Sequence, residues 1–190
     1  MSDSENIVLW KKKSEIDYIS LFVPLWFSLD AWMRDRYTED TDRNRLNLFK
    51  QGGHKIFEEF FSLLFGDDTR AKSFRGNLAD LHKSLENAKI PYDKEKSKFI
   101  SFTCVRDYQY GSKVQYINLL EKDETEEENK IELTEVIFIA NDESIVFRGF
   151  IEILYQIRCV LFHGDLKPNT ENERVIKQLY LILVEIMKKV

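Results

Sequence analysis

The residues of this chain best suited to chemistry are an arginine and a histidine at the end of one apolar stretch. Arg158 and His163 lie five positions apart in the segment QIRCVLFHG, which spans 156–164. A guanidinium binds anions, and an imidazole titrates near neutral pH. The pair therefore predicts chemistry on an anionic substrate.

A helix predicted over Glu143–Phe162 must position this pair. Its apolar residues recur at helical spacing. They are Val146, Phe150, Ile153, Leu154, Ile157, Val160 and Leu161. Gly164 follows as a helix stop, and Pro168 lies just beyond it.

The geometry of a straight helix separates the two side chains. Residues five apart point about 140° away from each other. The residues that share a face with His163 are Arg148, Glu152, Tyr155 and Cys159. Arg158 flanks the opposite edge of the apolar stripe, so a bent helix end or a second copy of the chain is needed to bring it to His163.

Four further residues are candidates for substrate binding or support: Arg148, Tyr155, Cys159 and Lys167. A structural alternative stays open for the pair itself. A histidine at a helix C-terminus can complement the helix dipole, and Arg158 can be a salt-bridged flank residue. We see no carboxylate cluster suited to a metal, and we expect no cofactor.

Composition indicates one globular domain over residues 1–190. Hydrophobic residues make up 43% of the chain and aromatic residues 13%, while only 7 Gly and 3 Pro favour long helices. The formal charge of −5 argues against a general nucleic-acid coat. A local basic site is compatible with that charge.

Cysteine usage and hydropathy predict a cytoplasmic location. Cys104 and Cys159 lie in apolar surroundings without metal-ligand spacing, as buried thiols of a reducing compartment do. The first six residues are polar and acidic, unlike a signal peptide. The longest apolar run, 18–29, contains Pro24 and is too short to span a bilayer. We therefore expect no membrane association.

Apolar periodicity and chain breakers predict the remaining helices. They are expected over 15–37, 54–65, from a Thr69 cap to about 88, and over 171–189. Pro24 is expected to kink or break the first of them. The polar segment 38–45 is predicted to be a loop.

The middle of the chain has a different character. Residues 91–97 are predicted to be a linker, and β-like runs at 99–105 and 114–117 predict a hairpin around Gly111. An acidic loop is expected at 121–129. The segment 131–140 fits either a strand or the start of a helix. We treat about 98–140 as a small β insert between helices.

The segment HGDLKPN at 163–169 resembles the catalytic loop of protein kinases, but this chain lacks residues that a kinase needs. It needs an asparagine five residues after Asp165, and position 170 is a threonine. No Gly-rich phosphate loop precedes the segment and no Asp-Phe-Gly follows it. A turn between two helices explains these residues better.

The spacing of Arg158 and His163 near the end of the penultimate helix resembles the HEPN superfamily, in particular its Apea-like and ribonuclease-toxin members. The usual signature is Arg, a polar residue that is commonly Asn, three variable residues and His. In IRCVLFHG, Cys159 takes the position of that Asn. The aromatic-rich first helix, from Tyr18 to Trp32, is similar to the opening helix of HEPN-like proteins.

This resemblance implies a mainly α fold, an antiparallel helical bundle that usually forms a homodimer, here with the small β-hairpin-like insert. Many HEPN members are metal-independent ribonucleases in which Arg and His of both protomers meet in a cleft at the twofold axis. The resemblance therefore implies catalytic roles for Arg158 and His163, RNA as substrate, and a toxin–antitoxin or phage-defence setting with a partner protein. A non-catalytic HEPN-like module that binds a protein or a nucleic acid is the alternative.

Overall fold

The computed structural model describes residues 16–92, 95–108, 114–120, 130–134, 137–140 and 142–190. Their helices are α2 (Tyr18–Arg36), α3 (Asp42–Phe49), α4 (Lys55–Phe65), α5 (Thr69–Ala88), α6 (Glu143–Phe162) and α7 (Thr170–Ile186). Their strands are β1 (Pro91–Tyr92), β2 (Glu95–Phe99), β3 (Val105–Asp107), β4 (Gln115–Ile117), β5 (Lys130–Thr134) and β6 (Ile137–Ala140). The predicted mainly α class is confirmed, and an HEPN-type bundle remains a prediction.

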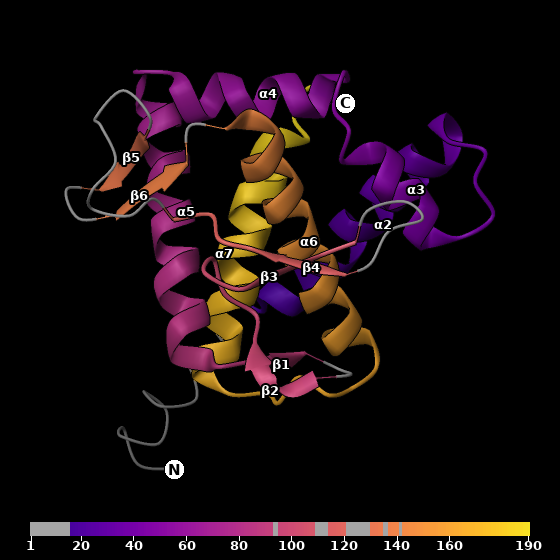
Figure 1. Ribbon diagram of the computed structural model, residues 1–190, viewed down its shortest axis with the longest axis vertical. Helices are drawn as coiled ribbons and strands as arrows, with labels where there is room; N and C mark the ends of the chain where they lie inside the picture. The colour runs from indigo at the N-terminus through magenta and orange to yellow at the C-terminus, as the bar shows by residue number, and fades with distance from the viewer. Residues whose placement is uncertain (1–15, 93–94, 109–113, 121–129, 135–136, 141) are drawn as a thin grey trace, which may run out of the picture.

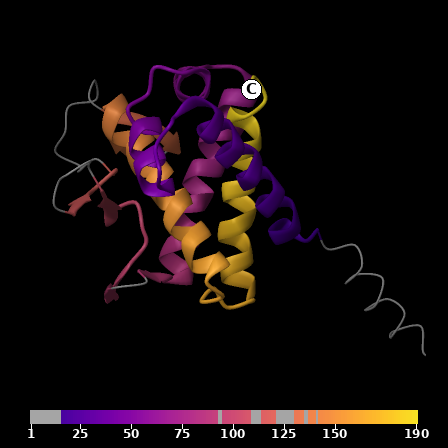
Figure 2. The same ribbon diagram turned by 90° about the vertical axis from the view of Figure 1, so that its right-hand side faces the viewer.

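Three long helices, α5, α6 and α7, lie side by side, and α4 crosses one end of them (Figure 1). α7 packs against both α5 and α2. α2 lies on the outside, in front of α6 and α7 in Figure 2. The short turn at 163–169 joins α6 to α7, so the residues around His163 lie at one end of the bundle.

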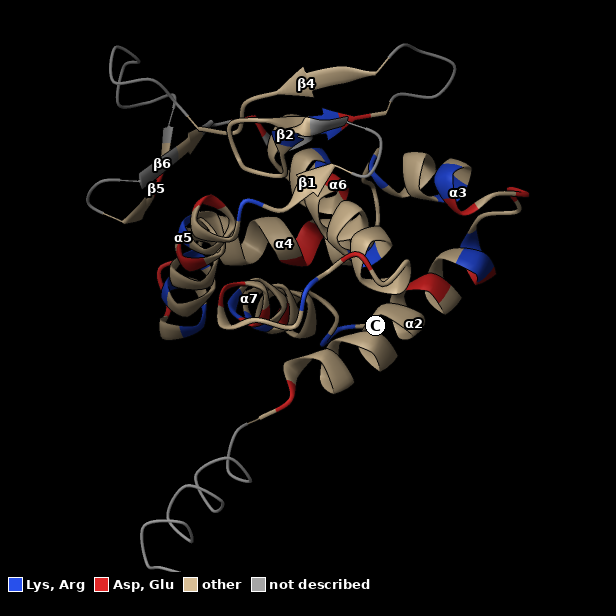
Figure 3. Cartoon of the chain, turned by 90° about the horizontal axis from the view of Figure 1, so that it is seen from below, with Lys and Arg blue, Asp and Glu red and all other residues tan. Residues whose placement is uncertain are grey.

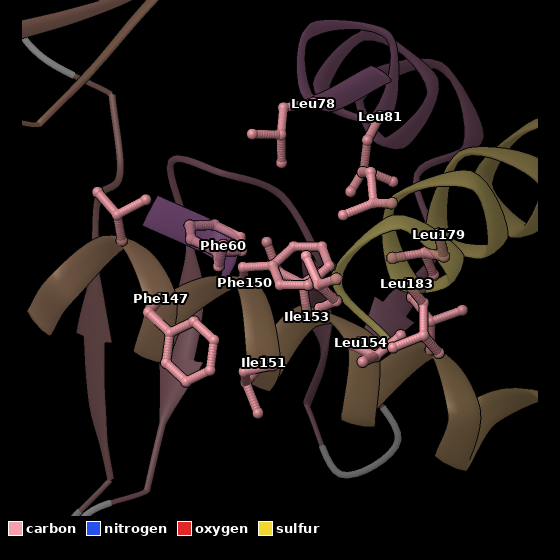
Figure 4. Close-up of a cluster of buried hydrophobic side chains, with 14 of the residues drawn as sticks. Phe60, Leu78, Leu81, Phe147, Phe150, Ile151, Ile153, Leu154, Leu179 and Leu183 are labelled. Carbon is pink, nitrogen blue, oxygen red and sulfur yellow. The ribbon is translucent and has the colours of Figure 1, made fainter. Parts of the chain in front are cut away.

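α6 supplies the centre of the hydrophobic core. Its residues Phe147, Phe150 and Leu154 are fully buried. Figure 4 shows them near Phe60 of α4 and Leu179 of α7. Burying an aliphatic or aromatic side chain of this size stabilises a fold by about 1.5–3 kcal/mol. The central position of α6 therefore explains the apolar periodicity that predicted this helix. Its predicted bounds, Glu143–Phe162, are confirmed.

Every described helix begins at a side chain that accepts a backbone N–H of the first turn. These caps are Asp17, Thr41, His54, Asp68, Asp142 and Asn169. The prediction that Thr69 caps α5 is wrong, because Asp68 Oδ1 accepts the N–H of Ala71 at 2.7 Å. A carboxylate one residue earlier satisfies the same donors and favours the positive end of the helix dipole.

The segment 38–45 is only partly the predicted loop. Thr41 Oγ accepts the N–H of Asn44 at 3.1 Å and starts α3 at Asp42. Only a few residues of this short helix, among them Leu46 and Phe49, are buried. So weak an apolar pattern does not distinguish a short surface helix from a loop.

Pro24 does not end α2, which continues through it from Tyr18 to Arg36. Of the two predicted effects, a break at Pro24 is therefore wrong, and a kink stays a prediction. No helix in the described part of the chain is both long and apolar enough to cross a membrane.

The middle of the chain contains antiparallel pairs of short strands. β3 pairs with β4, with Val105 opposite Ile117, so the predicted strand at 114–117 is confirmed, but its partner is 105–107 rather than the predicted run 99–105. β1 pairs with β2, so the predicted linker at 91–97 is wrong. β5 pairs with β6, so the described residues of the segment, 131–134 and 137–140, are strand rather than the start of a helix. The predicted acidic loop at 121–129 and Gly111 lie outside the described residues.

Candidate functional site

Arg158 lies one turn before the end of α6, with its side chain 19% exposed. Its guanidinium carbon is 4.6 Å from the ring centroid of Phe162 and 5.5 Å from that of Trp26. Its ion pair with Asp42 is long, at 3.8 Å, and its Nε is buried without a hydrogen-bond partner. An ion pair this long, with Asp42 40% exposed, contributes little. The guanidinium is therefore only partly neutralised and can still bind an anion.

His163 ends α6 with its backbone and leaves its imidazole exposed. Its N–H donates to the carbonyl of Cys159 at 3.0 Å. Gly164 follows at φ +78°, a conformation that favours glycine and stops the helix. Among the described residues, the imidazole has no hydrogen bond or ion pair. A substrate can therefore reach the imidazole.

Within one protomer the side chains of Arg158 and His163 point to different surroundings. Arg158 turns toward Trp26 of α2 and Asp42 of α3, whereas His163 stands in solvent beyond the last turn. No hydrogen bond or ring contact joins the two side chains in the part of the chain that the structure describes. A single protomer thus holds both groups at one end of α6 without bringing them together.

Tyr155 and Cys159 lie beside Arg158, whereas the helical wheel grouped both of them with His163 and placed Arg158 at the opposite edge of the apolar stripe. The Nη1 of Arg158 is 4.0 Å from Cys159 Sγ, and its guanidinium carbon is 5.8 Å from the Tyr155 ring centroid. Burial and the neighbouring Cys159 raise the pKa of Tyr155 to about 12, although Arg43 opposes that shift. Tyr155 is therefore a neutral phenol near pH 7 and can donate a hydrogen bond, but it is a poor base.

Arg148 and Lys167 lie away from this group. The Nε of Arg148 is 2.9 Å from Asp107 Oδ2, two to three turns before Arg158 on α6. Lys167 is exposed in the α6–α7 turn, where its carbonyl accepts a hydrogen bond from Asn172 Nδ2 at 2.8 Å. The structure therefore gives Lys167 a role in shaping the turn and shows no contact from it to Arg158 or His163.

A buried group of charges that sequence reasoning missed underlies this face of α6. Asp107 and Glu152 are fully buried. The Nζ of Lys50 lies 3.0 Å from Asp107 Oδ1 and also donates to Glu152. Arg43 Nη1 donates to both Glu152 oxygens, at 2.8 and 2.9 Å. With Arg148 these residues form what we call the ionic cluster, in which three cations face two carboxylates.

One signal for the ionic cluster is present in the sequence. Glu152 stands between Ile151 and Ile153 in an apolar helix, and a buried carboxylate requires a cationic partner. The helical wheel placed Glu152 on the face of His163, but the structure buries it completely. Its partner Lys50 is 102 positions away, and no local pattern identifies a partner at that distance.

The surroundings of the other two histidines, His54 and His82, indicate structural roles. His54 is buried, accepts the N–H of Phe57 on Nδ1 at 3.1 Å, and its Nε2 lies 2.9 Å from the Phe49 carbonyl oxygen. Its ring stacks on that of Phe49. His82 packs against Phe102. Burial lowers the pKa of both imidazoles, so both favour the neutral form.

No group of three or more His, Cys, Asp or Glu side chains suited to a metal ion occurs among the described residues. The comparisons add no relative. Neither a protein-family model, nor a curated protein, nor a solved structure matches this chain. Any functional assignment must therefore rest on the side chains themselves.

Proposed function

We propose that this chain is an HEPN-like protein that cleaves RNA internally without a metal ion. The observation that carries the proposal is the presence at one end of α6 of a partly neutralised Arg158 and of an exposed His163 whose imidazole has no partner among the described residues. Arginine and histidine are sufficient for cleavage beside a ribose 2′-hydroxyl, because that hydroxyl serves as an internal nucleophile.

In this mechanism the 2′-oxygen attacks the adjacent phosphorus and the bond from phosphorus to the 5′-oxygen breaks. An imidazole accepts the 2′-hydroxyl proton, and the departing 5′-oxygen takes up a proton from an imidazolium or from water. The guanidinium of Arg158 stabilises the charge that grows on the phosphoryl oxygens. The products are a 2′,3′-cyclic phosphate, or its hydrolysis product, and a 5′-hydroxyl.

We also propose that the active form is a homodimer joined along α2. The outward face of α2 is apolar: Leu21 is 41% exposed and Phe27 54% exposed, and Pro24 and Ala31 lie on the same face. Phe27 meets Phe162 of α6, which is 37% exposed, with ring centroids 5.8 Å apart. An exposed face of this kind is typical of an interface.

A second copy of the chain is the occupant that fits this face best. The guanidinium of Arg158 packs against the ring of Phe162, and Phe162 directly precedes His163 in the sequence. A twofold axis at this surface brings Arg158 of one protomer toward His163 of the other. The dimer thereby supplies the convergence that one protomer lacks.

A ribonuclease of this kind requires control, because uncontrolled RNA cleavage harms the cell that makes it. We therefore place the protein in the cytoplasm, in a toxin–antitoxin or phage-defence system with a protein partner that restrains it. RNA is the substrate class. The resemblance to HEPN toxins supports this setting.

A non-catalytic HEPN-like module is the second candidate, and Cys159 is the observation that favours it. A thiol is a weak hydrogen-bonding group, and within the described part of the chain it contacts Arg158 Nη1, at 4.0 Å, and Tyr155. An amide in this place orients its neighbours more firmly. RNA binding without cleavage would identify this candidate.

The test is cleavage of a single-stranded RNA by the purified protein in EDTA and in magnesium, with mass spectrometry of the products. We expect equal cleavage in both, 2′,3′-cyclic phosphate ends, and a loss of about 100-fold or more in Arg158→Ala and in His163→Ala. Lys83→Ala, a change at an exposed residue of α5, is the control. Cleavage that needs magnesium, or that survives in His163→Ala, contradicts the proposal.

A further inference from the structure

Arginine and tyrosine side chains alternate in one line from β3 to the end of α6. Arg106 lies 5.0 Å from the Tyr108 ring centroid, and Arg43 lies 4.3 Å from the same ring. The guanidinium of Arg43 is also 4.3 Å from the Tyr155 ring, on which Arg158 packs at 5.8 Å. We call these five residues the Arg–Tyr ladder. It leads directly to the candidate catalytic arginine.

A guanidinium within about 6 Å of a ring centroid is attracted by the electrons of the ring face. Here four consecutive contacts join three segments that are distant in the sequence: the end of β3, α3 and α6. Figure 1 shows β3 and β4 crossing in front of α6 toward α3. The insert thus extends the line beyond the helices.

The Arg–Tyr ladder is partly exposed to solvent, and buried ion pairs hold it from below. All five of its residues are partly exposed. Beneath it, Glu152 holds Arg43 by one nitrogen, Nη1, which leaves Nη2 and Nε for other partners. The ionic cluster has one positive charge in excess, because three cations face two carboxylates. The surface above it is therefore preorganised and locally positive in an acidic protein.

An acidic residue, Asp42, lies beside the Arg158 end of the ladder. Asp42 pairs with Arg158 at 3.8 Å and also with Arg45. Figure 3 shows basic and acidic segments side by side where α3 lies next to the end of α2. A polyanion on the ladder is therefore directed away from Asp42, toward Tyr108 and Arg106.

We propose that the Arg–Tyr ladder is the path on which single-stranded RNA lies next to the cleavage site. Phosphates contact the three guanidinium groups, and unpaired bases stack on the tyrosine rings. Proteins that bind single-stranded nucleic acid without strong sequence preference combine these two features. A duplex hides its bases from such rings, so the ladder selects unpaired RNA. The inference rests on the proposed ribonuclease function and adds the form of its substrate.

The test measures binding of a fluorescein-labelled RNA of about 12 nucleotides by anisotropy in the His163→Ala protein, which binds without cleaving. The added changes are Arg106→Gln and Tyr108→Leu, neither of which removes a side-chain ion pair or hydrogen bond that the described residues form. Lys83→Gln on α5 is the control for the lost charge, because α5 lies on the opposite side of the molecule from α3 (Figure 1). Thermal unfolding of each variant shows whether its fold is intact.

We expect Tyr108→Leu to raise Kd on the order of fivefold. Arg106→Gln should weaken binding and lower the slope of log K against log salt by about 0.7, the contribution of one phosphate contact on a single strand. Lys83→Gln should change neither quantity. The same RNA annealed to its complement should bind more weakly than the single strand.

Two outcomes overturn the inference, and they can be told apart. If the wild-type protein cleaves RNA but the two ladder variants bind as the parent does, the ladder serves only to hold α3 on α6, and the ribonuclease proposal survives. Duplex RNA bound as tightly as single-stranded RNA leads to the same conclusion. If the wild-type protein neither binds nor cleaves RNA, the proposed function fails and the ladder inference fails with it.

Discussion

Cys159 is the residue at which this chain departs from the HEPN signature, and its surroundings indicate what a change there should do. The side chain is half-buried between Tyr155 and Arg158, outside the hydrophobic core formed by the other face of α6. The helical wheel placed Cys159 on the face of His163, outside the apolar stripe of the helix. An amide at this position can hydrogen-bond the guanidinium or a phosphate more strongly than a thiol can.

We therefore expect Cys159→Asn to fold normally, with a free energy of unfolding within about 1 kcal/mol of the wild type. RNA cleavage should stay the same or rise. Urea unfolding and the cleavage assay measure the two effects. Cys159→Ala serves as the matched control, because it removes the thiol without adding an amide. A Cys159→Asn protein that does not fold would show that the thiol is needed in the packing of α6.

The candidate site illustrates what could be predicted from the sequence at the level of residues. Arg158 and His163 were identified by type and spacing, whereas helical geometry grouped Tyr155 and Cys159 with His163 and did not predict their contacts with Arg158. Arg43 was not identified, because it lies in a segment that we predicted to be a loop and meets α6 only through the tertiary fold. A contact between residues 109 positions apart leaves no local pattern in the sequence.

At the level of elements, the ionic cluster ties α3 and β3 to α6. Glu152 is the shared partner of Lys50 and Arg43, and it also accepts the N–H of Tyr108 at 3.3 Å. Removing one member of a buried ion pair leaves uncompensated charge and costs about 3–5 kcal/mol. The cluster therefore controls whether α3 and the β3–β4 hairpin stay in place.

We expect Glu152→Gln to lower the free energy of unfolding by about 3 kcal/mol or more, since Lys50 and Arg43 lose their common carboxylate. The same change at the exposed Glu171 should cost no more than about 0.5 kcal/mol. Urea unfolding at constant pH measures both values. Equal values for the two variants would show that the cluster contributes little to holding these elements together.

α4 begins at a buried histidine, which predicts a dependence of stability on pH. Burial lowers the pKa of His54, and its neutral form is the one that accepts the N–H of Phe57 on Nδ1. The unfolded chain binds a proton below about pH 6.5, where the folded imidazole does not. The contribution of His54 is therefore present above pH 6.5 and is lost as pH falls through the lowered pKa of the folded state.

His54→Asn keeps a side chain that can cap the helix but cannot titrate. We expect the wild type to lose more stability than this variant between pH 7 and pH 5.5, by at most about 1.4 kcal/mol per pH unit. Urea unfolding at both pH values measures the difference. Because burial also lowers the pKa of His82, His82→Gln is the second variant to compare. Identical pH profiles for wild type and His54→Asn would exclude this role.

The elements were predictable to different extents. Long helices with buried faces, such as α5 and α6, were predicted to within a residue or two, because many apolar residues repeat in each. Short strands carry too few residues for a pattern. β1 has two residues and was taken for part of a linker, and α3 shows a polar surface with few buried positions. Their structures depend on tertiary contacts.

At the level of the whole molecule, the apolar outer face of α2 predicts self-association. Phe27 and Phe162 are exposed, so changing them costs the protomer little packing. We expect Phe27→Asp and Phe162→Ser each to shift the protein from dimer to monomer at micromolar concentration, with unchanged far-UV circular dichroism. Light scattering measures the mass. Phe65→Ser, at an exposed phenylalanine of α4, is the control and should stay dimeric.

A wild-type protein that is monomeric at micromolar concentration would contradict the dimer directly. A dimer that withstands both changes would place the interface elsewhere on the surface. In that case the twofold axis would not bring Arg158 and His163 together, and the composite site would have to be abandoned.

The most direct test of the central claim is complementation between two inactive proteins. If Arg158 of one protomer acts with His163 of the other, co-expressed Arg158→Ala and His163→Ala chains form mixed dimers that retain one intact combination. We predict that each variant alone is inactive and that the mixture recovers about a quarter of wild-type RNA cleavage, because half of the dimers are mixed and each holds one complete pair. A mixture as inactive as its two components, beside an active wild type, would show that the two residues do not act together across the interface.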